Sequence, residues 1–170
     1  MATFSGNFNK IMETINQKIR DDIPPMLAIT ARNFVLDNFK KEAWQGETEE
    51  PWKPRKDTNN KKKLLIASGE GKNSIQAHSE PYKAIISVGG GDFSYMKYHN
   101  SGSNETTVQN VKAFTRKIKK GKHRGKEQNV RAFTRTVRYN LPKRQFIGRS
   151  PVLIKELKEI IIEELNKLNK

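Results

Sequence analysis

The segment Asn110-Val111-Lys112-Ala113-Phe114-Thr115-Arg116 returns nineteen residues later as Asn129-Val130-Arg131-Ala132-Phe133-Thr134-Arg135. A solenoid needs at least three copies of its repeat, so two copies do not indicate one. Two β-rich segments joined by a polar linker instead favour the two strands of a hairpin. The linker Lys119–Gln128 forms its tip. The sequence therefore predicts a long basic β-hairpin arm over residues 110–140.

One face of this predicted hairpin is aromatic and basic, because side chains alternate between the two faces of a strand. This face consists of Lys112, Phe114, Arg116, Arg131, Phe133 and Arg135. In a hairpin symmetric about its tip, Phe114 faces Phe133. The same symmetry places Arg116 opposite Arg131 and Lys112 opposite Arg135. Like charges opposite each other destabilise a sheet, which indicates that these six residues bind an anionic partner.

The net charge of +15 is concentrated in the same part of the chain. Residues 110–149 hold 14 lysine or arginine residues against the single acid Glu127, a net charge of +13. Such a concentration attracts phosphates or acidic protein surfaces in a salt-dependent way. Two interpretations stay open, a merely solvated arm and an anion-binding surface. Basic residues interleaved with aromatic ones are also typical of nucleic-acid platforms.

Helical spacing marks the N-terminal part, residues 1–46. Apolar residues recur every three or four positions and predict an amphipathic helix; they are Phe4, Phe8, Ile11, Ile15 and Ile19. Pro24-Pro25 is expected to interrupt it, and a second helix is expected to end near Trp44–Gly46. Both helices have an apolar face to bury.

The middle of the chain predicts a loop and then a small antiparallel sheet over residues 64–109. Glu47–Lys63 is polar and contains two prolines, so it reads as an exposed loop with Trp52 as its anchor. Short β-rich runs separated by turn residues predict strands at Ser74–Ala77 and Lys83–Val88, with order resuming at Phe93–Tyr98. Gly89-Gly90-Gly91-Asp92 and Ser68-Gly69-Glu70-Gly71 read as turns.

The C-terminal helix is expected over residues 150–168, with Ser150 as its cap and Pro151 in its first turn. Its apolar stripe is expected to pack on the sheet. The prediction is a single α+β domain over residues 1–170, with N-terminal helices, a small antiparallel sheet, a long basic hairpin and this helix.

Several functional classes find no support in the sequence. The chain has no cysteine, and no apolar stretch approaches the roughly 20 residues of a membrane helix. His78, His99 and His123 are scattered and lack metal-ligand spacing. Asp21-Asp22 and Glu163-Glu164 read as solvated surface. We therefore expect no catalytic residue, no metal and no cofactor, and an enzyme is the third hypothesis after assembly and nucleic-acid binding.

Residues 25–168 contain a series of short motifs. Those of the first half are Phe39 with Trp44, Trp52-Lys53-Pro54-Arg55, Leu64-Leu65 with Ser68-Gly69, and Ser74-Ile75. Those of the second half are Tyr98-His99-Asn100-Ser101-Gly102 and Leu141-Pro142-Lys143-Arg144-Gln145-Phe146-Ile147-Gly148. The order of these motifs resembles the phage virion morphogenesis family, the Mu-like tail completion proteins. The first motif of the second half is similar to the family's tyrosine-histidine-glycine strand end, and the other is similar to its proline-arginine-phenylalanine-glycine motif before a last helix.

This resemblance implies a structural protein of the tail completion or head–tail joining type. It implies virion tail or connector proteins as partners, and a homo-oligomer such as a ring. The expected location is the virion, and the host cytoplasm during assembly. The structural motif residues it assigns are Trp52, Tyr98, His99, Gly102, Pro142, Arg144, Phe146 and Gly148. The basic repeat lies outside the resemblance, so the alternative of a nucleic-acid-binding module stays open.

Overall fold

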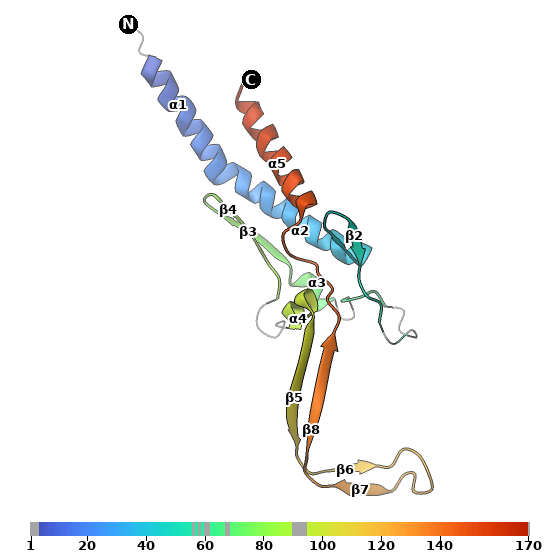
Figure 1. Cartoon of the computed structure of the whole chain (residues 1–170). Coiled ribbons are helices and arrows are strands. Elements are labelled where there is room, and N and C mark those ends of the chain that lie inside the picture. Colours follow the sequence, from blue (N-terminus) through green and yellow to red (C-terminus); the bar gives the residue numbers. More distant parts are fainter. Residues whose placement is uncertain are drawn as a thin grey trace. The chain divides into compact units, whose positions relative to one another are not determined.

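Residues 4–55, 57, 59, 62–66, 69–89 and 95–169 are described by a computed structural model (Figure 1). The chain forms two compact units. The body consists of Met1–Ser101 and Pro142–Lys170, and the hairpin consists of Gly102–Leu141. The predicted α+β class is confirmed, with N-terminal helices, antiparallel strands and a C-terminal helix.

The two N-terminal helices are continuous, contrary to the break expected at Pro24-Pro25. Helix α1 (Phe4–Gln17) passes through the π-helical segment η1 (Lys18–Asp22) into α2 (Ile23–Lys41). The prolines lie in the first turn of α2, and the N–H groups that they lack would otherwise donate to carbonyls of the preceding turn. The π turn is closed by the Ile23 N–H, which donates to the Lys18 carbonyl. The Arg20 carbonyl accepts a 3.0 Å bond from the Tyr82 N–H.

Helix α2 ends at Lys41, slightly before the expected Trp44–Gly46. Glu42 adopts a left-handed conformation with φ of 54°, which turns the chain into β1 (Ala43–Gln45). Strand β1 pairs antiparallel with β2 (Glu49–Pro51), so the expected loop Glu47–Lys63 contains a short strand near its start. After β2, Trp52 is buried, and its indole Nε1 donates to the Gln145 carbonyl at 2.7 Å.

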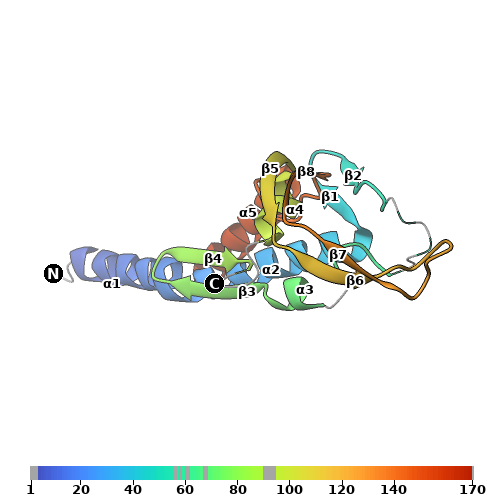
Figure 2. The same cartoon turned by 90° about the horizontal axis from the view of Figure 1, so that it is seen from below.

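The predicted strands near residues 74–88 form an antiparallel ribbon. Strand β3 (Gln76–Glu80) pairs with β4 (Lys83–Ser87), and both pack on α2 (Figure 2). The strands of the described residues form four two-stranded sheets rather than one small sheet. Part of the predicted turns, Ser68 and Gly90–Asp92, and the start of the predicted ordered run at Phe93 lie outside the described residues.

Two short helices occupy positions where turns and a strand were expected. Glu70–Asn73 forms α3, and Tyr95–Ser101 forms α4. Packing overrides the β-rich composition here, because Met96 of α4 is 1% exposed and belongs to the core. Gly71 of α3 is buried, and a Cβ added to it would lie 2.6 Å from the Met96 sulfur. A larger residue at position 71 would therefore have to displace the end of the Met96 side chain from the core.

The core of the body joins segments from both ends of the chain. Its buried cluster consists of Val35, Phe39, Trp52, Leu64, Ile75, Met96 and Phe146. The Phe39 ring lies edge-on to Trp52 at 5.5 Å between centroids, and it contacts Phe146 at 5.1 Å. Phe146, from the segment before the last helix, thus closes a core built mainly from the first hundred residues.

Helix α5 (Pro151–Asn166) begins as the sequence predicts, because the Leu153 N–H donates to the Ser150 Oγ at 3.3 Å. It packs mainly on α2 rather than on the sheet as expected. Glu164, predicted as solvated, is buried and forms a 3.0 Å ion pair with Lys18 of η1. Hydrogen bonds from Lys167 and Lys18 lower the pKa of Glu164. This ion pair explains why an acidic residue lies between α5 and η1.

Candidate anion-binding surface on the hairpin

The predicted hairpin is present, and it begins nearer the N-terminus than expected. Strand β5 (Ser103–Val111) pairs with β8 (Phe133–Leu141), and β6 (Phe114–Lys117) pairs with β7 (Glu127–Val130). Residues 112–113 and 131–132 interrupt the strands, and Figure 1 shows a bend between the two strand pairs. Each copy of the repeat therefore forms a strand, a two-residue break and a second strand.

The register differs from the one expected for a hairpin symmetric about its tip. Phe114 pairs with Val130 rather than with Phe133, and Phe133 pairs with Val111. Arg116 lies opposite Gln128, and Arg135 lies opposite Gln109. The expected oppositions of like charges were wrong. The observed register avoids their repulsion and places a glutamine oxygen opposite Arg116 and opposite Arg135.

Hydrogen bonds across the strands follow the repeat. Arg116 Nε donates to the Gln128 side-chain oxygen at 3.2 Å, and Arg135 Nε donates to that of Gln109 at 3.2 Å. The Thr115 hydroxyl donates to Asn129 at 2.8 Å in the same way that the Thr134 hydroxyl donates to Asn110 at 3.0 Å. The two halves of the hairpin thus share their residue pairs and these side-chain bonds, and Arg135 adds a second bond to the Gln109 oxygen through Nη2 at 3.0 Å.

The tip, Ile118–Lys126, is held by its main chain. The Ile118 N–H donates to the Lys126 carbonyl at 2.9 Å, and the Gly125 N–H returns a 2.9 Å bond to the Ile118 carbonyl. Gly121 and Gly125 have φ of 86° and 88°, a left-handed conformation that glycine adopts without strain. The tip contains five lysine or arginine residues and no acid.

The hairpin is strongly cationic and lacks a core of its own. It has eleven lysine or arginine residues, all exposed, against two glutamates. None of the ion pairs between described residues involves the hairpin. No hairpin side chain that the structure describes is buried, and Phe114 and Phe133 are 43% and 44% exposed. An isolated two-stranded hairpin is marginally stable in water, so this unit gains from a partner that covers it.

The six predicted binding residues all lie on this exposed hairpin, but they do not form one continuous face. Arg116 and Phe114 belong to the β6–β7 pair, and Arg135 and Phe133 belong to the β5–β8 pair. Lys112 and Arg131 lie in the two breaks between these pairs. Near the tip, an open hollow of about 440 Å³ is lined by Arg116, Lys117, Ile118, Lys119, Lys120 and Gln128.

Gln109 and Gln128 are functional candidates that the sequence analysis missed. They hold the two arginines, and they occupy equivalent positions immediately before each copy of the repeat. Extending the repeat by this one residue would have identified them. Glutamine is uncharged, so it holds the arginine guanidinium without neutralising it. The positive charge of the arginine stays available to a ligand.

Some residues of the predicted structural motif are buried, and others are exposed. Arg144 is buried, and its Nε donates to the Lys53 carbonyl at 3.0 Å. Phe146 is in the core, whereas Tyr98 is exposed on α4 and Gly148 is exposed before α5. Gly102 follows α4 with φ of 74°, and Pro142 follows β8. Trp52, Arg144 and Phe146 therefore support the fold around the start of the last helix.

His99, in α4, is partly buried beside this motif. Its carbonyl accepts a 2.8 Å bond from the Arg144 N–H. Its ring lies edge-on to Tyr95, and its Nδ1 is buried without a hydrogen-bond partner among the described residues. Burial, and secondarily the positive charge of Arg144, lowers the pKa of His99 below its ordinary value of 6.5. The imidazole is therefore uncharged at neutral pH.

We expect His99 to contribute to loss of stability in mild acid. Because its pKa is lower in the folded chain, the unfolded chain binds the proton first as pH falls below 6.5. Stability is therefore retained above 6.5 and falls as pH drops towards the folded pKa. The free energy of unfolding, measured with urea at about pH 8 and at about pH 5, should differ less between the two pH values for His99→Phe than for the wild type. His123→Phe, at the exposed tip, should behave like the wild type, and equal pH dependence of all three would exclude this role.

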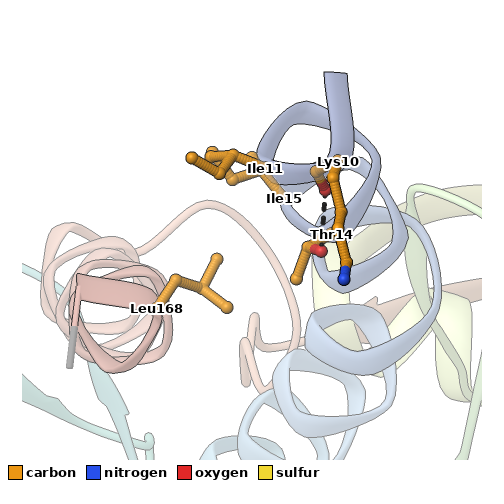
Figure 3. Close-up of a pocket in the computed structure, with 5 residues that line it drawn as sticks. All are labelled: Lys10, Ile11, Thr14, Ile15 and Leu168. Atoms are coloured by element: carbon orange, nitrogen blue, oxygen red, sulfur yellow. Dashed lines mark hydrogen bonds between the residues drawn. The ribbon is translucent and has the colours of Figure 1, made fainter. Parts of the chain in front are cut away.

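A second exposed surface lies on α1. Phe8 and Ile11 are each 56% exposed, Met12 follows them on α1, and the exposed Ile19 follows in η1. Beside them, a hollow of about 300 Å³ is lined by Lys10, Ile11, Thr14, Ile15 and Leu168. In Figure 3, Leu168 lies across this hollow from Ile11 and Ile15. The apolar face of α1, expected to be buried, is therefore largely open.

The described residues contain no group of three or more histidine, aspartate or glutamate side chains arranged to hold a metal ion. Within the same described ranges, no helix has the length and hydropathy needed to cross a membrane. Comparison of the chain with protein-family models, curated proteins and solved structures finds no match.

Proposed function

We propose that this chain is a structural phage morphogenesis protein of the tail completion or head–tail joining type, and that it acts by binding other proteins rather than by catalysis. One observation carries the proposal. The hairpin exposes eleven cations that form no ion pair within the described part of the chain, and it has no buried side chain among those described. The hairpin is then stabilised by an anionic partner that it meets during assembly.

Homo-oligomerisation is the second element of the proposal, and the open apolar face of α1 supports it. A stripe that includes Phe8, Ile11 and Met12 is exposed on α1. Contiguous exposed apolar residues of this kind commonly mark protein–protein contacts. In this account, copies associate through α1, as in a ring, and present several hairpins to the virion partner. The protein is then located in the virion, and in the host cytoplasm during assembly.

A nucleic-acid-binding module is the alternative function, and the exposed phenylalanines favour it. Phe114 and Phe133 each lie two residues before an exposed arginine. Aromatic rings beside cations are the usual surface for unpaired bases and their phosphates. Binding of DNA by the hairpin is compatible with an assembly role, because copies of the chain would associate through α1 of the body and not through the hairpin.

We expect Ile11→Asp to reduce self-association without unfolding the body. A carboxylate in the centre of the apolar stripe would have to lose its hydration on association, which is costly. Sedimentation equilibrium should show a lower mass for Ile11→Asp than for the wild type at the same concentration. Asn9→Asp adds the same charge at an exposed position of α1 outside the stripe, and it serves as the control. Equal masses for the wild type and Ile11→Asp would remove α1 from the interface.

A further inference from the structure

The two halves of the hairpin are equivalent in more than sequence. The proximal half-site, on the β5–β8 pair, consists of Gln109, Val111, Phe133 and Arg135. The distal half-site, on the β6–β7 pair, consists of Gln128, Val130, Phe114 and Arg116. In each, a valine pairs with a phenylalanine and a glutamine pairs with an arginine. The first part of one repeat therefore pairs with the second part of the other at both places.

Each half-site also repeats the same chemistry. The Arg116 and Arg135 Nε atoms are held at 3.2 Å by a glutamine oxygen, which restricts the guanidinium before a ligand arrives. A pre-organised cation loses less conformational entropy when it binds an anion. Phe114 and Phe133 have nearly equal exposure, 43% and 44%. Each half therefore offers one fixed positive group and one exposed aromatic ring.

We propose that the hairpin carries two equivalent half-sites for nucleic acid, each taking a phosphate at its arginine and an unpaired base at its phenylalanine. The inference rests on the proposed anion-binding role of the hairpin and specifies its ligand. A duplicated site fits a polymer that presents the same phosphate and base at every step. An acidic protein surface supplies the negative charge but not the unpaired bases that stack on exposed aromatic rings. One single-stranded nucleic acid reaches both half-sites.

Bivalent binding has a measurable signature in the length of the ligand. An oligonucleotide too short to reach both half-sites gains only a small statistical factor in affinity from the second half-site. A strand that reaches both binds the second half-site at a high effective concentration. For the full chain and oligothymidylates of about 4 to 16 nucleotides, affinity should therefore rise steeply, by about 100-fold, once the strand spans both.

Paired variants separate the two half-sites. We compare Phe133→Ala/Arg135→Gln with Phe114→Ala/Arg116→Gln, because a glutamine can still bond to the facing glutamine and keep the strands paired. Amide hydrogen exchange checks that the hairpin is retained. The control Val152→Ala/Lys155→Gln removes the same charge and an exposed apolar side chain from α5. Both half-site variants should lose the steep rise, to an equal extent within about twofold, and the control should keep it.

Three results would overturn the proposal. A smooth increase of affinity with length in the wild type would mean that there is no second half-site. A steep rise that survives in one of the two paired variants would mean that the halves are not equivalent. A wild-type chain that ignores oligothymidylates at physiological salt but binds polyglutamate would exclude nucleic acid as the ligand. This third result would leave the proposed assembly function in place, because that function needs only an anionic partner.

Discussion

Replacing Phe146 with alanine should lower the free energy of unfolding by about 3 to 5 kcal/mol, the usual loss for a buried phenylalanine. Phe146 is 1% exposed and contacts the Phe39 ring. Its backbone is also fixed, since its N–H donates to Asn100 at 2.9 Å and its carbonyl accepts from Asn38 at 3.1 Å. The cavity would therefore form in a region that cannot easily collapse. Urea unfolding of the body measures the effect.

Phe114→Ala is the matched control for this prediction. Phe114 is 43% exposed and lies in the hairpin, opposite Val130. Its truncation removes a partly exposed ring and leaves the core of the body unchanged. The expected loss is well below that of Phe146→Ala. If the two variants shifted the urea midpoint equally, Phe146 would not be part of the core that closes the body.

Replacing Arg116, Arg131 and Arg135 together with glutamate should lower the affinity of the hairpin for an anionic partner by on the order of 100-fold or more. The change reverses three exposed charges that have no ion pair among the described residues. Glutamate cannot donate to Gln109 or Gln128, so the hairpin also loses its arginine–glutamine bonds. The body should melt as before. Binding to a duplex oligonucleotide and to polyglutamate, at several salt concentrations, measures the loss.

The control for this reversal changes the same number of charges in the body. Lys97, Lys155 and Lys158 are exposed and lie in α4 and α5. Their replacement with glutamate should reduce binding only through the change in overall charge, and therefore much less. Should the hairpin variant bind both probes as tightly as the wild type, the arginines would belong to a merely solvated arm.

The repeat predicted the hairpin but could not predict its register. The two copies of the repeat stay equivalent to each other in any antiparallel register, so the repetition alone favours no register. The register depends on which side chains face each other across the strands. The expected register opposed Arg116 to Arg131, whereas the observed one pairs Arg116 with Gln128. Comparing the like-charge repulsion of one register with the hydrogen bonds of the other would have selected the observed pairing.

Contacts between distant segments explain the differences in the body. Pro24-Pro25 was expected to end a helix, yet η1 precedes it and the Tyr82 N–H, from the turn between β3 and β4, satisfies the Arg20 carbonyl. No local pattern around the prolines predicts that donor. Likewise, Tyr95–Ser101 is helical because Met96 packs in the core against Gly71. The Ser150 cap, by contrast, is a local feature, and the sequence located it correctly.

The mass of the full chain in solution tests the central claim, assembly through protein surfaces, most directly. Light scattering at low and high salt, combined with negative-stain images, should give an oligomer, with a mass that is an integer multiple of 19.6 kDa above that of the monomer, and closed, ring-like particles. Salt should have little effect on this mass, because the proposed contacts of α1 are apolar. A monomer at both salt concentrations that shifts DNA would contradict the assembly account and support the nucleic-acid-binding module instead.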